Sequence, residues 1–292
     1  MQNGAKIGVL GGDARQAILC RRLSEKGFET AIWGIGSADV GGAVRCNNWR
    51  SAIEGSKAVI LPLPAFKEGK YVLTDALGKD TVTLAQLLHE MPQDSLLCGG
   101  KLDDIVKKSA AHHGIELLDY FDSEKLQIFN AILTAEGALE LILRELPISI
   151  FRSRILVCGY GRIGRILSRM LREMGAKVYV SARKESDIAY IQCDGNFAIE
   201  NGSDSFLKAA IDSDVIINTV PAKIIGETVL KRIAGCRLIV DLASGDGGVD
   251  FAIAEKFEIK SIHALALPGK TAPESAGNIL AECVLDLLLK RE

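Results

Sequence analysis

The feature that most constrains the fold of this chain is a strand–turn–helix unit that occurs twice. Residues 9–16 read VLGGDARQ, and the same framework returns as VCGYGRIG over residues 157–164. A short apolar strand that runs into glycines is how a dinucleotide-binding turn begins. The chain therefore predicts two related α/β units, one with a complete turn and one with an altered turn. A constant offset without gaps pairs Gly11 with Gly159, Leu19 with Leu167, Leu23 with Leu171, Glu25 with Glu173 and Gly27 with Gly175.

Strand-like runs alternate with amphipathic helical patterns along the whole chain, which is typical of parallel α/β architecture. With 292 residues, 48% of them hydrophobic, the chain can build two cores. We predict an α/β fold with two doubly wound parallel-sheet, Rossmann-like domains. The expected strands are 5–10, 28–33, 42–46, 57–61, 95–98 and 115–119, then 154–158, 176–181, 214–219, 236–242 and 258–262. The expected helices are 13–26, 83–90, 101–113, 162–174, 203–210 and 223–234.

Two further helices are predicted to connect the domains. The segment 122–147 is opened by Asp122 or Ser123 and stopped by Pro147, and its apolar positions cover more than one face. The last helix starts with Pro273 in its first turn and is predicted to return to the first domain. We therefore divide the chain into a substrate-side domain (1–121 with 273–292), a linking helix (122–147) and a cofactor domain (148–272), and expect a cleft between the domains.

Composition excludes several classes of function. The net charge is −2 with 35 basic residues scattered along the chain, which disfavours binding to nucleic acid or to an anionic membrane. The N-terminal apolar strand is too short for a signal peptide, and no apolar run approaches about 18 residues, so we expect a cytoplasmic protein. The seven cysteines form no Cys-x-x-Cys pair and the four histidines have no ligand-like spacing, so no metal site is expected.

The complete turn reads Gly159-Tyr160-Gly161-Arg162-Ile163-Gly164 between a predicted strand and helix. In such a turn Gly159 allows the tight bend, Gly161 lets backbone amides approach a pyrophosphate, and Gly164 lets helix and strand pack closely. Arg162 and Ile163 open the helix, whose N-terminus attracts an anion. The pattern alone is weak evidence, because a glycine-rich turn can lack a ligand, but this strand–turn–helix context favours a bound dinucleotide.

The next strand indicates which dinucleotide. Where an Asp or Glu would bond the adenine-ribose 2′-hydroxyl, the chain has Ser181 and Ala182, followed by Arg183 and Lys184. A hydroxyl with a guanidinium accepts a 2′-phosphate that a carboxylate would repel, which favours NADP, with NAD as the alternative. The basic pair can also be a solvated turn. Three residues after a central strand are expected to border the nicotinamide ribose: Thr219, Val220 and Pro221.

In the altered turn, Asp13 and Gln16 replace the second and third glycines. A carboxylate and a bulky side chain at these positions should exclude a dinucleotide. Arg15, in the first helical turn, is predicted to help bind a smaller anion such as a carboxylate; alternatively, Asp13 only caps the helix and Arg15 is solvated. Lys67, Lys101 and Lys270, on loops that follow other strands, are further candidates for substrate binding, although each can be an ordinary solvated lysine.

Eight segments together resemble a known family. They are GGDARQ, ILPLP, CGGK, NAILTAEGALELIL, CGYGRIG, NTVPA, DLAS and LPGKTAPESAG, in order over nearly the whole chain. The set resembles the A subunits of dipicolinate synthase from spore-forming bacteria, with one departure, since Asp246 stands where a proline is expected. The resemblance implies NADP-dependent oxidation of dihydrodipicolinate, a small dicarboxylate, to dipicolinate in the mother cell during sporulation. It also implies a smaller, flavoprotein-like B subunit, hence a hetero-oligomer.

The reaction needs a proton acceptor, for which the candidates are Asp241, His263 and Glu136. Asp241 ends a predicted strand, but it can equally cap the following loop, and His263 can equally be a packing residue. A rival interpretation is a relative of D-2-hydroxyacid or alanine dehydrogenases, whose usual Arg and His–carboxylate set we do not find in the chain. A third is a nucleotide-sensing subunit without catalysis.

Overall fold

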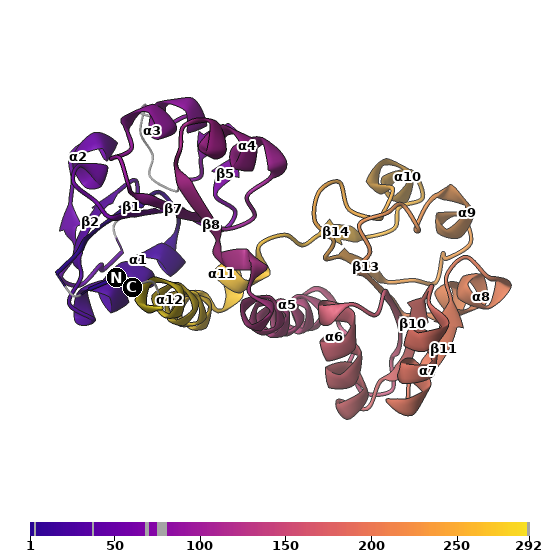
Figure 1. Ribbon diagram of the computed structural model, residues 1–292. Coiled ribbons are helices and arrows are strands. Elements are labelled where there is room, and N and C mark those ends of the chain that lie inside the picture. Colours follow the sequence, from indigo (N-terminus) through magenta and orange to yellow (C-terminus); the bar gives the residue numbers. More distant parts are fainter. Residues whose placement is uncertain (3, 37, 68–69, 75–80, 291–292) are drawn as a thin grey trace. The chain divides into compact units, whose positions relative to one another are not determined.

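The chain folds into two compact units, each built on one parallel sheet (Figure 1). The computed structural model describes residues 1–2, 4–36, 38–67, 70–74 and 81–290. Unit 1 comprises Met1–Phe129 with Ala272–Glu292, and unit 2 comprises Asn130–Thr271. The predicted α/β class with two doubly wound, Rossmann-like domains is confirmed, including a long helix that joins them and a C-terminal helix that returns to the first.

In unit 1, six strands lie in the order β3-β2-β1-β4-β7-β8. All pairs in this sheet are parallel, and buried aliphatic side chains cover both of its faces. The strands are β1 (Lys6–Leu10), β2 (Glu29–Trp33), β3 (Val44–Arg45), β4 (Ala58–Ile60), β7 (Leu96–Gly99) and β8 (Glu116–Asp119), and the helices between them are α1 (Ala14–Glu25), α2 (Trp49–Ile53), α3 (Leu84–Glu90) and α4 (Asp104–His112).

Unit 2 repeats this topology, with the strand order β11-β10-β9-β12-β13-β14. The sequence predicts five of these strands and misses β11, a four-residue edge strand whose Phe197 is exposed. The strands are β9 (Arg154–Cys158), β10 (Lys177–Ala182), β11 (Phe197–Glu200), β12 (Val215–Asn218), β13 (Leu238–Asp241) and β14 (Ser261–His263), and the helices are α6 (Arg162–Glu173), α7 (Glu185–Cys193), α8 (Asp204–Asp212), α9 (Glu227–Leu230), α10 (Phe251–Lys256) and α11 (Leu267–Thr271).

Two long helices complete the fold. The predicted linking helix is α5 (Glu124–Glu145), and it is long and apolar enough to cross a membrane by length and composition alone. Half of its apolar window is buried, and Ala135, Ala138 and Ile142 belong to the unit 2 core, as in a core helix. The returning helix is α12 (Pro273–Leu289), which packs on α1, with Gly277 against Ile18.

One element in unit 1 departs from the predicted arrangement. The loop predicted to carry Lys67 instead contributes β5 (Phe66–Lys67), which forms an antiparallel hairpin with β6 (Tyr71–Val72); residues 68–69 between them lie outside the described part of the chain. In unit 2, the expected helix 223–234 shortens to the four residues of α9. Both corrections concern segments at the carboxyl edge of a sheet, where loop contacts rather than periodicity decide the conformation.

Candidate functional site

The complete glycine turn joins β9 to α6, and packing explains two of its glycines. Gly159 has φ +99°, and a Cβ there would lie 2.5 Å from Thr219 Oγ1. A Cβ on Gly164 would overlap the carbonyl oxygen of Gly159. A side chain at Gly159 would therefore meet the segment after β12, and a side chain at Gly164 would meet the backbone of the turn.

The middle glycine of this turn has a different role. Gly161 is the N-cap of α6, it makes no side-chain capping hydrogen bond, and a Cβ there would meet no atom within 4 Å. Packing within the protein therefore does not require glycine at this position. A ligand that approaches the helix N-terminus closely would require glycine there, because a side chain would occupy its space. Arg162 is exposed and Ile163 is half-buried in the first helical turn. This open, uncapped helix N-terminus fits a pyrophosphate, which would accept hydrogen bonds from its amides.

Side chains that the sequence analysis did not single out brace this turn. The Tyr160 hydroxyl donates a hydrogen bond to Asp194 at the end of α7, and burial with this contact raises the pKa of the phenol to about 12. Arg165 donates from Nε to the Tyr160 carbonyl at 3.0 Å and pairs with Asp187 at 3.2 Å. Its guanidinium lies over the rings of Tyr160 and Tyr190. Two contacts therefore join the turn and the start of α6 to α7: Tyr160 with Asp194, and Arg165 with Asp187.

The predicted NADP-selecting residues separate into two groups. Ser181 is fully buried in β10, beside the Cys158 thiol, whose pKa burial raises to about 12. The Ser181 carbonyl accepts a hydrogen bond from the Gly159 amide, and the predicted contact of its buried hydroxyl with a 2′-phosphate stays a prediction. Arg183 and Lys184, which follow the strand, are exposed. Of the predicted set, these two side chains are accessible to a 2′-phosphate.

The segment after β12 lines the turn from the other side. Thr219 donates from both its backbone nitrogen and its hydroxyl to the Cys158 carbonyl, each at 2.9 Å. The Val220 amide donates to Asn218 Oδ1, and Pro221 is exposed. Thr219 and Val220 therefore lie against Gly159 of the turn, and the contact of the three residues with the nicotinamide ribose stays a prediction.

Asp241 is a structural residue rather than an available base. It is fully buried, and its carboxylate accepts hydrogen bonds from Asn218 Nδ2 and from the amides of Ala243, Gly248 and Val249 at 2.7–3.1 Å. Three of these donors are backbone amides of the loop after β13, and the fourth is the side chain of Asn218 at the end of β12. The alternative that Asp241 caps this loop is therefore correct, and its prediction as an acid–base group is wrong, because no face of the carboxylate is left for a substrate proton.

The other two candidate bases stay predictions. His263 is half-buried, with Nε2 3.0 Å from the Ala243 carbonyl and its ring stacked on Phe251. Glu136 is exposed on α5. The described contacts of Glu136 include none with His263 or Asp241, so the three candidates do not form one catalytic group among the described residues.

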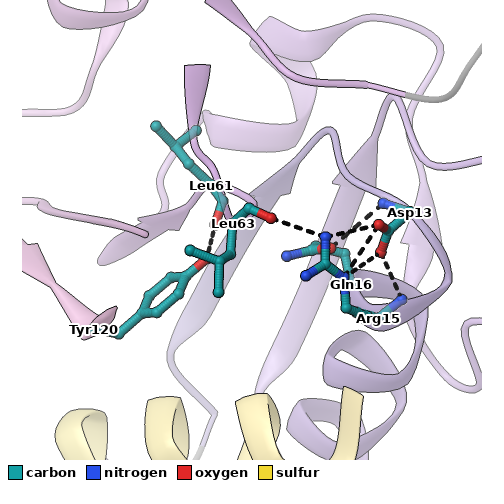
Figure 2. A network of polar contacts seen from close by, with 6 residues as sticks. All are labelled: Asp13, Arg15, Gln16, Leu61, Leu63 and Tyr120. Carbon is teal, nitrogen blue, oxygen red and sulfur yellow. Dashed lines mark hydrogen bonds and ion pairs between the residues drawn. The ribbon is translucent and has the colours of Figure 1, made fainter. Parts of the chain in front are cut away.

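The altered turn of unit 1 is closed by its own side chains (Figure 2). Asp13 is the N-cap of α1 and forms a capping box with Gln16. The guanidinium of Arg15 donates to both Asp13 oxygens at 2.8–3.1 Å and from Nη2 to the Leu63 carbonyl at 2.8 Å. Asp13, which is partly exposed, therefore neutralises the buried Arg15. The alternative of a solvated Arg15 is therefore wrong, and its predicted binding of a small anion stays a prediction.

Backbone contacts complete this closure. The Gly12 amide donates to the Leu73 carbonyl at 2.8 Å, immediately after the β5–β6 hairpin. In a dinucleotide-binding turn such an amide would face the ligand. Unit 1 therefore fills with protein the position that unit 2 leaves open.

The three candidate lysines are exposed, and each stays a prediction. Lys67 lies on β5, Lys101 has its ammonium 5.4 Å from the centroid of the Phe121 ring, and Lys270 lies on α11 of unit 2. Within unit 1, Arg15, Lys67 and Lys101 follow β1, β4 and β7, which are adjacent in the sheet. Among the described residues, no group of three His, Cys, Asp or Glu side chains could hold a metal ion.

Comparisons with known proteins identify both halves. Residues 6–121 match the family model for the N-terminal domain of the dipicolinate synthase A subunit. The chain is also 35% identical to the A subunit of dipicolinate synthase from Bacillus subtilis (strain 168), over 99% of this chain and 97% of that protein. This chain belongs to the family of dipicolinate synthase A subunits. Residues 140–268 match the NAD-binding domain of D-isomer specific 2-hydroxyacid dehydrogenases, so this family carries a dehydrogenase-type nicotinamide-nucleotide domain.

Solved structures agree with this assignment. The A chain of dipicolinate synthase from Bacillus subtilis superposes with a TM-score of 0.86 at 33% identity, covering 99% of this chain and 97% of that chain. The A subunit from Bacillus halodurans gives 0.88 at 28% identity and 99% coverage of both. A transhydrogenase from Sinorhizobium meliloti, at 13% identity, shares the fold with a TM-score of 0.67, covering 97% of this chain and 92% of that chain.

Proposed function

We propose that this chain oxidises dihydrodipicolinate to dipicolinate with NADP, acting with a B subunit in the cytoplasm of the mother cell during sporulation. The observation that carries the proposal is the open glycine turn of unit 2 in a chain of this family: Gly161 caps α6 without a side chain and leaves free space beside the helix N-terminus. The dehydrogenase-type domain match supports a nicotinamide nucleotide.

NADP supplies the hydride acceptor when it is bound. The amides at the start of α6 bind its pyrophosphate, and Gly159 and Gly164 fix the turn at the required distance from β9. Exposed Arg183 and Lys184 bind the 2′-phosphate. Thr219 and Val220, held against the turn by the Cys158 carbonyl and by Asn218, orient the nicotinamide side.

The chemistry asks little of a catalytic base. The substrate loses one hydride and one proton and becomes an aromatic pyridine ring, so NADP becomes NADPH and a proton is released. Aromatisation drives the reaction toward product, and the enzyme contributes mainly orientation and a proton acceptor. His263 or Glu136, or a water molecule, serves as that acceptor, since the buried Asp241 is fully hydrogen-bonded.

Turnover of purified protein tests this proposal. Dihydrodipicolinate generated in situ is mixed with the chain and NADP, with and without a B subunit, and NADPH absorbance and dipicolinate are followed together. Equal amounts of both products support the proposal. NADP binding without turnover in either mixture supports a sensing subunit instead, and reduction of NAD or NADP by a 2-hydroxyacid, without dipicolinate formation, supports the hydroxyacid dehydrogenase alternative.

A further inference from the structure

Gln16 carries a buried hydrogen-bond donor that no described residue pairs with. Its exposed fraction is 0%, and its Oε1 faces the Asp13 amide at 3.4 Å in the capping box. Its Nε2 has no hydrogen-bond partner in the described part of the chain. A buried amide donor without an acceptor costs free energy, so its persistence indicates an acceptor from outside the chain.

A second donor lies next to it. Arg15 uses Nε and Nη2 in its described hydrogen bonds, to Asp13 and to Leu63, which leaves Nη1 out of them. The Arg15 and Gln16 side chains both converge on Asp13, whose own side chain is 39% exposed against 9% for Arg15 (Figure 2). The donors of Arg15 and Gln16 thus lie beside Asp13, whose side chain is partly exposed to solvent.

The position of these donors in the fold is one where ligands bind. The chain runs from β1 outward to β2 and β3, then crosses back to β4 on the other side of β1. Open α/β sheets bind ligands at the carboxyl ends of the strands where the order reverses in this way. The Arg15–Leu63 hydrogen bond spans this point, because Arg15 follows β1 and Leu63 follows β4.

The surroundings select the kind of ligand. The Leu73 carbonyl takes the Gly12 amide, and a Cβ on Gly11 would overlap the same carbonyl, so the turn has no room for a pyrophosphate. Asp13 already balances the charge of Arg15, so a ligand here gains hydrogen bonds rather than a free cation. Gln16 Nε2 and Arg15 Nη1 have no acceptor in the hydrogen bonds of the described residues, and such a pair of donors matches a group with two acceptor oxygens, such as a carboxylate.

We propose that Gln16 Nε2, together with Arg15, binds one carboxylate of a small dicarboxylate at the altered turn of unit 1. The identity of that dicarboxylate as dihydrodipicolinate rests on the proposed function. In this arrangement Asp13 is a positioning residue that holds Arg15, and Gln16 supplies a hydrogen-bond donor to the carboxylate. The altered turn is then a second ligand site that was remodelled from the repeated unit.

Two substitutions at one residue isolate this donor. Gln16→Glu keeps an acceptor for the Asp13 amide, and hence the capping box, but replaces the donor with an acceptor. Gln16→Met removes both groups without adding charge. Gln86→Met is the matched control, since Gln86 forms the capping box of α3 with Thr83 on an exposed surface. Binding of dipicolinate to the full chain is measured by calorimetry with saturating NADP, and NADP binding and melting temperature are measured on each variant.

We expect both Gln16 variants to bind dipicolinate at least 10-fold more weakly than wild type and Gln86→Met, while their NADP affinity stays within about twofold. Unchanged dipicolinate affinity in a folded Gln16→Glu or Gln16→Met variant overturns the proposal and assigns the donor to a buried water. Isophthalate, which carries two carboxylates in the same relative positions on a benzene ring, is measured as a second probe. If the wild-type protein binds neither dipicolinate nor isophthalate, the proposal is also overturned. Dicarboxylate binding that depends on Gln16, in a protein that does not oxidise dihydrodipicolinate, refutes only the proposed reaction.

Discussion

The two glycine turns begin from the same framework and end in opposite states. Gly11 and Gly159 occupy equivalent positions, and their amides donate to Trp33 and Ser181, the paired residues of the neighbouring strand. Beyond this point the turns diverge. In unit 2 the helix N-terminus has no side-chain cap, whereas in unit 1 Asp13, Gln16 and the Leu73 carbonyl satisfy the corresponding amides. Two side chains and one backbone carbonyl therefore distinguish the closed turn from the open one.

The sharpest way to break this comparison is to give the second turn the residue of the first. In Gly161→Asp, the backbone φ of −76° suits any residue and no atom lies within 4 Å of the new Cβ, so folding should be unaffected. The carboxylate would face the pyrophosphate, and we expect NADP and NAD to bind about 100-fold more weakly, or roughly 3 kcal/mol.

Calorimetry with both nucleotides measures this effect, and melting temperature monitors the fold. Gly161→Ala is the control for bulk without charge and should lose less affinity than Gly161→Asp. Full-strength nucleotide binding by a folded Gly161→Asp protein would show that the pyrophosphate does not approach α6, and the contrast between the two turns would lose its functional meaning.

The parts of the fold that depend on hydrophobic periodicity and on glycine positions could be predicted from the sequence. The repeated unit predicts two like sheets because it preserves the strand, the turn and the buried leucines of the helix, such as Leu19 and Leu167, both with no exposed surface. β11 escaped prediction because an exposed four-residue edge strand has no apolar alternation to detect. The β5–β6 hairpin was not predicted because its contact with the altered turn, between the Leu73 carbonyl and the Gly12 amide, joins residues that are distant in the sequence, and a local pattern does not reveal such a contact.

A second prediction concerns the preference for NADP over NAD, which we assign to the exposed residues that follow β10. In Arg183→Asp, a charge-assisted contact to the 2′-phosphate is replaced by repulsion, and NADP affinity should fall about 10- to 100-fold, or roughly 1.5–3 kcal/mol. NAD affinity should stay the same or rise, because a carboxylate there can accept from the ribose hydroxyls. Lys208→Glu, with the same charge change on an exposed face of α8, is the control. Equal losses for both nucleotides would mean that the phosphate binds elsewhere.

The site was less predictable than the fold, because residue type does not reveal what a side chain already contacts. Asp241 has the chemistry of a base, but four donors within its own loop and the neighbouring strand occupy it. Arg15 has the chemistry of an anion receptor, but Asp13, two residues earlier, neutralises it. Gln16 was predicted only as bulk that excludes a dinucleotide, and its unused donor became visible only in the packed structure. For the Tyr160–Asp194 contact, the one indication in the sequence was the presence of a tyrosine between Gly159 and Gly161.

The smallest expected effect concerns that contact, which has no counterpart in the first turn, where Gly12 stands in place of Tyr160. In Tyr160→Phe the hydrogen bond to Asp194 is lost and the ring remains, so we expect unfolding to become easier by about 1 kcal/mol, and both NADP and NAD to bind about two- to fivefold more weakly. Because burial raises the pKa of this phenol to about 12, the contribution is complete below the unfolded pKa of about 10 and is lost as pH rises toward 12. Denaturant unfolding of both proteins from pH 7 to 11 should therefore show a constant difference up to about pH 9 that shrinks above it. A difference in unfolding free energy that grows with pH would contradict a neutral Tyr160 donor. A loss of affinity for NADP but not for NAD would mean that Tyr160 positions α7 and the preceding Arg183, and not the turn alone.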